Sequence, residues 1–273
     1  MTNQAKPSLE EFFGNAPAPL DGSSPWASRY ASDLKRMIQE YSARRPRSVQ
    51  KHLGPSELGE ACSRQVVAKM ANAPTTNHVT DPWASFVGTA IHAEMENVLR
   101  WHNQHTGELR WIPEQRVYPL DDHPGTADAY DAKEKCLTDW KALSKARRDK
   151  VRNQGPPRKY LVQILLYAHG YRRLGLPVER VALVILPRTS STMDDIYVWD
   201  RPYTEEDDQI LADVFEQTEA RKQLAQMVID GKLGVMDIPA SPSDESCYFC
   251  PIFRPEAKKD GTWGCPGHRA ALY

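Results

Sequence analysis

The sequence predicts a mixed α/β fold, with a central sheet flanked by helices. Three observations lead to this prediction: short segments with the alternation typical of strands, longer segments with helical spacing, and the order of both along the 273 residues. Two helices precede the strands, a third separates the last two strands, and a fourth follows them. Such an order places helices against the faces of one mixed sheet.

Each predicted element has a simple sequence signal. Apolar residues recur at helical spacing or form short strand-like runs, and a capping box of Thr204 and Asp207 marks the start of the last helix. The second and third strands form a hairpin inside the sheet, with a turn near residues 132–135. The predicted helices are 28–45, 89–102, 160–174 and 204–229, and the predicted strands are 114–120, 126–131, 136–142 and 181–187.

Composition excludes several classes of protein. Hydrophobic residues make up 40% of the chain, enough for one large or two small domains. No run of about 18 apolar residues occurs, and the N-terminus lacks the order of a secretory signal, so we expect a cytoplasmic protein without membrane contact. Lys and Arg number 35 against 36 for Asp and Glu, so any site for an anion must be local.

The stretch GTADAYDAKEKCLTDWK carries the clearest chemical signal. Alternation in a strand puts Asp139 and Lys141 on one face, and Asp128 on the neighbouring strand can reach the same face. Two carboxylates and an ammonium then share a site that suits Mg²⁺ or Mn²⁺, with water as a nucleophile and the lysine stabilising charge on a phosphate. The alternative is a surface hairpin whose Asp and Lys are merely solvated.

Four pieces of the sequence follow one another in this order: GTAIHAEME with His92, GTADAY with Asp128, TDWK with Asp139 and Lys141, and QILLY with Gln163 and Tyr167. Together they resemble the PD-(D/E)XK nuclease superfamily, in the branch shared by RecB-like nuclease domains and four-cysteine CRISPR-associated (Cas-four type) exonucleases. Ala127 stands where the family name has proline. The resemblance implies a restriction-endonuclease-like core and Mg- or Mn-dependent deoxyribonuclease activity.

The resemblance also implies the roles of these residues. It makes His92, Asp128 and Asp139 the ligands of the catalytic metal, where His92 alone would more often be a core histidine. Glu94, Glu96 and Glu114 are further carboxylates that this ligand set does not include. The catalytic residues that the resemblance implies are Asp128, Asp139, Lys141, Gln163 and Tyr167.

Cysteines predict a second metal site. An odd count of five in a reducing compartment favours metal ligands over disulfides, and the pair Cys247 and Cys250 has the spacing that brings two thiolates to one metal. Cys136 is interpreted as a buried apolar residue. The four-cysteine branch implies a [4Fe-4S] cluster on Cys62, Cys247, Cys250 and Cys265, whereas the spacing C-x2-C-x14-C-x2-H leaves Zn²⁺ on Cys247, Cys250, Cys265 and His268 as the alternative.

A basic segment adjoins the D-x-K motif. Between Lys141 and Lys159 the chain has eight Lys or Arg and one acidic residue, so this segment is a candidate path for DNA phosphates, although a solvated charged face is the simpler reading of such a run. The predicted DNA-binding residues are Lys145, Arg147, Arg148, Lys150 and Arg152.

Together these patterns predict three regions: a disordered tail at 1–27, a RecB-like nuclease core at 28–240, and a cysteine-rich segment at 241–273 that packs with Cys62. The expected function is a metal-dependent exonuclease on single-stranded DNA or free ends, in recombination, repair or CRISPR-type processing, in a bacterium or a phage-infected cell. The chain has no P-loop, so unwinding would need a helicase or recombination partner. The alternative is a non-catalytic module that keeps the fold to bind DNA or to act as a scaffold.

Overall fold

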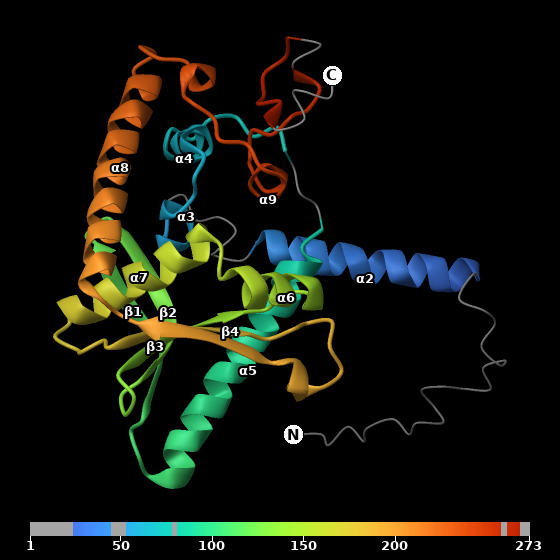
Figure 1. Ribbon diagram of the computed structural model, residues 1–273. Helices are drawn as coiled ribbons and strands as arrows, with labels where there is room; N and C mark the ends of the chain where they lie inside the picture. The colour runs from blue at the N-terminus through green and yellow to red at the C-terminus, as the bar shows by residue number, and fades with distance from the viewer. Residues whose placement is uncertain (1–23, 45–52, 78–80, 258–260, 268–273) are drawn as a thin grey trace, which may run out of the picture. The chain divides into compact units, whose positions relative to one another are not determined.

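The computed structural model describes residues 24–44, 53–77, 81–257 and 261–267, and Figure 1 shows the course of the chain. The chain divides into two compact units, Met1–Val49 and Gln50–Tyr273. Most of the predicted tail, and His268, lie outside the described residues. No helix in the described part is both long and apolar enough to span a membrane.

The described part of the first unit is helix α2, Pro25–Ala43. Ser24 caps it, because its Oγ accepts a hydrogen bond from the Ala27 N–H at 3.1 Å. Its apolar residues recur every three or four positions and are exposed: Trp26, Tyr30, Leu34, Met37 and Tyr41.

The second unit is built on a five-stranded mixed sheet in the order β1-β2-β3-β4-β5. The pairs β1–β2, β2–β3 and β4–β5 are antiparallel, and β3–β4 is parallel. A parallel neighbour needs a crossover, which the chain makes through two helices between β3 and β4. The strands are β1 Trp111–Leu120, β2 His123–Asp131, β3 Cys136–Lys141, β4 Arg180–Ile185 and β5 Tyr197–Pro202.

Helices precede, interrupt and follow these strands, as Figure 1 shows. The α-helices are α3 Pro55–Leu58, α4 Ser63–Met70, α5 Trp83–Thr106, α6 Lys145–Gln154, α7 Arg158–Arg173, α8 Glu205–Ile229 and α9 Asp244–Tyr248, and two 3₁₀ helices cover Met193–Asp195 and Val235–Asp237.

The largest hydrophobic core lies between the sheet and helix α7. Nine of the residues of α7 are buried, and the ring of Tyr171 stacks on that of Tyr130 of β2 with centroids 5.0 Å apart. A smaller cluster joins Leu99 of α5 to Ala129 and Trp140 on the sheet. Because side chains alternate along β3, Trp140 packs into this cluster on one face of the sheet. Its neighbours Asp139 and Lys141 lie on the other face.

The sheet and its main helices agree with the sequence prediction. The central hairpin has its turn at 132–135, and the capping box of Thr204 and Asp207 starts α8. The elements that were not predicted are α3, α4, α6, α9, β5 and the two 3₁₀ helices. Helix α6 buries only Arg148 and Val151, so it has almost no apolar periodicity to detect.

Candidate functional site

The centre of the site is the point where strands β2 and β3 stop pairing. Their register runs from Asp131↔Cys136 to Ala129↔Thr138 and ends there, one residue before Asp128 and Asp139. The N–H of Trp140 donates instead to Asp128 Oδ2 at 2.7 Å. A carboxylate thus takes the place of a backbone carbonyl, so both aspartates lie where the two strands separate.

His92 approaches Asp128 from helix α5. Its Nδ1 lies 3.1 Å from Asp128 Oδ1, and Asp128 is itself buried. Burial opposes charge on the imidazole, but the hydrogen bond and the charge of Asp128 outweigh it and raise the pKa of His92. The two residues that were predicted from separate motifs are therefore direct neighbours.

Glu114 of β1 belongs to the same group. Ligand atoms of His92, Glu114 and Asp128 all lie within 4.8 Å of one another. Glu114 has φ +52°, a left-handed conformation that is uncommon for a residue with a side chain, in the middle of a strand. The adjacent residues pair normally, Pro113 with Ala129 and Gln115 with Ala127, so the distortion is confined to the position facing Asp128.

Asp139 and Lys141 form the other half of the site. Asp139 is 2% exposed, and its Oδ2 lies 2.6 Å from Lys141 Nζ, in an ion pair without hydrogen-bond geometry. Burial, aided by the charge of Asp128, raises the pKa of Asp139 even though Lys141 acts in the opposite direction. Asp139 is a carboxylate that the protein buries at a cost, which is a common feature of functional sites.

Helix α7 supplies the last predicted residues. Lys141 Nζ donates to Gln163 Oε1 at 2.8 Å, and it lies 4.8 Å from the centre of the Tyr160 ring. Gln163 Nε2 in turn donates to the hydroxyl of Tyr167 at 3.4 Å. The motif QILLY therefore provides a chain of contacts that ends on the lysine of the D-x-K motif.

Close packing explains why the motif GTADAY begins with a glycine, Gly125. A Cβ at position 125 would lie 2.7 Å from Cε1 of Tyr167 and 2.7 Å from Cγ of Pro55. Only a residue without a side chain allows α7 to approach β2 this closely. Gly125 thereby helps to bring the α7 residues to the aspartates.

All the residues predicted for the nuclease site thus converge at one end of the β2–β3 pair, and Glu114 joins them. The group within 4.8 Å does not include Asp139, whose carboxylate contacts Lys141 instead. Glu114 was named by the sequence analysis but left outside the ligand set. Its distance of fourteen residues from Asp128 gave no reason to choose it over Glu94 or Glu96.

The predicted DNA-binding residues lie on helix α6 but differ in their surroundings. Arg148 is buried, and its guanidinium is held by Asp149 and Asp195 at 2.6 Å each. Lys145 also pairs with Asp195, at 3.0 Å. By contrast Arg147, Lys150 and Arg152 are exposed, and Arg152 lies over the ring of Tyr197. Arg148 therefore anchors α6. The exposed basic side chains of the helix are Lys145, which pairs with Asp195, and Arg147, Lys150 and Arg152.

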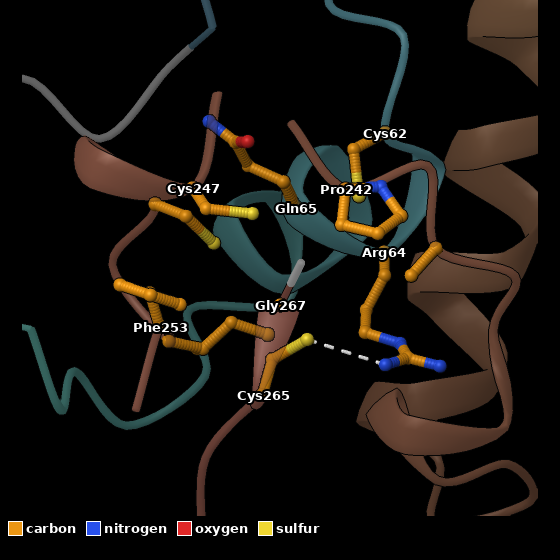
Figure 2. A pocket seen from close by; sticks show the side chains of 11 residues that line it. Cys62, Arg64, Gln65, Pro242, Cys247, Phe253, Cys265 and Gly267 are labelled. Atoms are coloured by element: carbon orange, nitrogen blue, oxygen red, sulfur yellow. Dashed lines mark hydrogen bonds between the residues drawn. The ribbon is translucent and has the colours of Figure 1, made fainter. Parts of the chain in front are cut away.

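Four of the five cysteines line one pocket, which Figure 2 shows. They come from distant parts of the chain: the N-cap of α4, helix α9 and the turns after it. All four are buried and none forms a disulfide. Burial, with the three neighbouring cysteines, raises the pKa of the Cys250 thiol to about 11. The four residues are Cys62, Cys247, Cys250 and Cys265.

Arg64 is a polar neighbour of these thiols. Its Nη1 donates to Cys265 Sγ at 3.2 Å, and its other donors bind the carbonyls of Ile238 and Met236. Cys136 is buried separately in β3, where burial raises the pKa of its thiol. The structure therefore groups Cys62, Cys247, Cys250 and Cys265 and leaves Cys136 apart, as the sequence analysis predicted.

Comparison with known proteins gives structural likenesses only, since neither a protein-family model nor a curated protein matches this chain. The fold is similar to an alkaline exonuclease, LHK-Exo, from Laribacter hongkongensis, with a TM-score of 0.45 and 12% identity, over 66% of this chain and 91% of that chain. The same enzyme in complex with dAMP gives a TM-score of 0.43 and 10% identity, over 66% of this chain and 91% of that one.

A phage-related exonuclease from Haemophilus somnus 129PT gives a TM-score of 0.44 and 12% identity, over 67% of this chain and 96% of that chain. These proteins are exonucleases, the class of enzyme whose motifs the sequence resembles. A likeness at this identity and TM-score does not bear on the activity of this chain.

Proposed function

We propose that the chain is a metal-dependent DNA exonuclease that hydrolyses phosphodiester bonds at the point where β2 and β3 separate. The observation that supports this most is the arrangement of Asp128, Asp139 and Lys141, in which both carboxylates and the ammonium meet at the end of one strand pair. The arrangement combines a cation site with a positive group for the phosphate, which are the two needs of phosphodiester hydrolysis.

The residues at this point fit a divalent cation. Ligand atoms of the Glu114 and Asp128 carboxylates and of the His92 imidazole lie within 4.8 Å of one another. The buried Oδ2 of Asp139 lacks a hydrogen-bond partner. Oxygen ligands suit Mg²⁺, and a mixed set of oxygen and imidazole suits Mn²⁺. We assign His92, Asp128 and Asp139 as ligands, with Glu114 as a fourth. When bound, the ion would polarise the phosphate and lower the pKa of a water nucleophile.

The remaining residues of the site act on the phosphate and on one another. Lys141 can donate to a phosphate oxygen and stabilise the charge that develops there. Its ammonium is held in place by Asp139 on one side and by Gln163 on the other, at 2.6 and 2.8 Å. Tyr167 orients Gln163 through the hydroxyl contact. These contacts fix Lys141 before substrate binds, which reduces the reorganisation needed during the reaction.

The exposed face of α6 provides a path for the DNA strand. Arg147, Lys150 and Arg152 continue from the segment that follows Lys141, and contacts of this kind bind phosphates without reading bases. We propose single-stranded DNA or free ends as the substrate, with a helicase or recombination protein as partner. Recombination, repair and CRISPR-type processing are the settings that this substrate suggests.

The four-cysteine pocket fits a metal centre. Four buried cysteines without a disulfide offer four sulfur ligands from both ends of the second unit. We propose that they hold a [4Fe-4S] cluster, as in the four-cysteine branch, and that this site has a structural role. Zinc is the other metal that three of these cysteines suit, with His268 as its fourth ligand.

A time course on end-labelled DNA tests the proposed activity. The wild-type protein, purified without oxygen, is incubated with 5′- or 3′-labelled single-stranded and duplex DNA in Mg²⁺, Mn²⁺ or EDTA. We expect metal-dependent loss of one end label before the other, and a brown protein with visible absorption from the cluster. Tight, salt-sensitive binding without cleavage in either metal would contradict the proposal and support a non-catalytic module.

A further inference from the structure

Residues 54–62, which we call the strap, connect the cysteine site to helix α7. Gly59 lies in this strap without room for a side chain, because a Cβ there would lie 2.8 Å from Cβ of Val162 and 3.2 Å from Cα of Lys159. Both neighbours belong to the first two turns of α7. The strap backbone is therefore in direct contact with the start of the helix that carries Gln163.

Glu60 connects three parts of the fold through one buried carboxylate. It is 7% exposed, and it accepts hydrogen bonds from Lys159 Nζ at 3.2 Å and from Ser246 Oγ at 2.7 Å. Ser246 immediately precedes Cys247, and Glu60 lies two residues before Cys62. A buried carboxylate is costly unless such partners remain in place. The positions of α7, α9 and the strap are thus interdependent.

The same helix then reaches the nuclease site. Lys159 lies one turn before Gln163, and Tyr160 lies directly after Lys159. Gln163 accepts a hydrogen bond from Lys141 at 2.8 Å, and the ring of Tyr160 lies 4.8 Å from the same ammonium. A small displacement of the first turn of α7 would therefore change both contacts of Lys141 on that side.

We propose that Glu60 is a positioning residue that couples the cysteine site to the nuclease site through the first turn of α7. Glu60 touches neither the substrate nor the metal ligands of the nuclease site, and it acts by holding Lys159 in register with the strap. The inference rests on the proposed nuclease function for its effect on cleavage, but the contact between the strap and α7 is independent of that function.

Two matched substitutions in the strap test the coupling. Glu60→Gln keeps the shape of the side chain but removes the charge that holds Lys159. Glu57→Gln is the control, because Glu57 lies in the same strap but pairs with Lys69 of α4 at 2.5 Å. Both variants are examined for metal content and visible absorption, thermal unfolding, DNA affinity, single-turnover cleavage, and hydrogen exchange of α7.

The Glu60→Gln variant should load the cysteine site as the wild type does. We expect its cleavage rate at saturating DNA to fall by about tenfold, because misplacement of a group at a reacting centre slows the chemical step more than binding. DNA affinity should stay within about twofold, and amides of residues 158–163 should exchange about tenfold faster. The control should change neither quantity by more than about twofold.

A purely structural role gives a different result. If Glu60→Gln lowers the unfolding temperature while the folded protein keeps the wild-type cleavage rate and α7 exchange, the inference is overturned. Should this variant fail to fold, Lys159→Gln removes the same contact from the half-exposed side of the pair. We expect the same slow cleavage in Lys159→Gln, and a full cleavage rate there would equally reject the coupling.

The readouts also separate this inference from the proposed function. If the wild-type protein cleaves no DNA, the nuclease proposal fails. Hydrogen exchange in Glu60→Gln still decides whether the strap holds α7. Removal of the metal from the cysteine site of the wild type should accelerate exchange in residues 158–163 more than in strand β4. Unchanged exchange there, or equal acceleration in β4, would overturn the coupling.

Discussion

The nuclease site and the cysteine site are built in opposite ways. The residues of the nuclease site come from strands and long helices, and their side chains already bind one another: Asp128 with His92 and the Trp140 N–H, Lys141 with Asp139 and Gln163. The four cysteines come from a helix cap, a five-residue helix and turns. The fold organises the first site, whereas the second site has little regular structure to organise it.

This difference predicts different consequences of metal removal. A site built on a sheet should keep its geometry when the divalent ion is absent, because strand pairing and hydrophobic packing hold its residues. A site formed by turns depends on the energy of its metal, which becomes folding energy. Loss of the catalytic ion should therefore cost activity, and loss of the cysteine-bound metal should cost stability.

The largest expected effect is on folding. Replacing Cys250 by Ser should release the metal from the cysteine site and lower the free energy of unfolding by more than about 3 kcal/mol, or cause aggregation. Cys136→Ser is the matched control, because Cys136 is equally buried but lies in β3 away from the other cysteines. It should retain the metal. Metal analysis with chemical denaturation measures both variants, and a stable, metal-free Cys250→Ser protein would contradict the structural role.

A moderate effect is expected when Glu114 is replaced by glycine, which should raise stability but weaken binding of the divalent ion. Glycine accepts the left-handed backbone that Glu114 adopts, so Glu114→Gly should raise the free energy of unfolding by about 1 kcal/mol. Loss of the carboxylate should weaken Mn²⁺ binding by about tenfold, measured by paramagnetic resonance of free Mn²⁺.

Lys135→Gly provides the control for this position. Lys135 has φ +49° in the turn between β2 and β3, outside the site. The same backbone relief should occur there, with Mn²⁺ affinity unchanged. Equal Mn²⁺ affinity in Glu114→Gly and wild type would remove Glu114 from the ligand set.

The smallest effect concerns the path of the DNA. Lys150→Gln should weaken DNA binding by about threefold and reduce the slope of log affinity against log salt by about one, because one phosphate contact is lost. Lys232→Gln changes an exposed lysine that pairs with Asp230, and it should leave both quantities unchanged. Fluorescence anisotropy over a range of salt concentrations measures them, and equal slopes for the two variants would exclude α6 as the path.

The sequence predicted the elements with strong periodicity and the side chains in compact motifs. The strand alternation around Asp139 and the helical spacing of Gln163 and Tyr167 are local patterns, so the residues that meet at the site were identifiable. The central hairpin was predicted for the same reason.

Features that depend on distant contacts were not predictable. Glu114 reaches the site through a backbone distortion, which no spacing in the sequence reveals. Arg148 appeared to belong to the basic segment, but Asp195, 47 residues away, holds it inside the fold. Helix α6 was missed because its sequence lacks an apolar stripe, and β5 because strand preference alone is a weak signal at a sheet edge.

The most direct test of the central claim is the cleavage rate of Asp139→Asn compared with that of Asp131→Asn. Asp131 is a buried carboxylate in β2 outside the site, and although burial raises its pKa, Arg110 and backbone N–H groups outweigh this and hold that pKa below its ordinary value. Its substitution should therefore cost stability but not the activity of the folded protein.

Asp139→Asn should instead cost activity but not stability. We expect cleavage to fall by at least about 10³-fold, with DNA binding kept and an unfolding temperature within about 4 °C of the wild type. Cleavage by Asp139→Asn within about tenfold of the wild-type rate would show that the separation of β2 and β3 is not where the phosphodiester is hydrolysed.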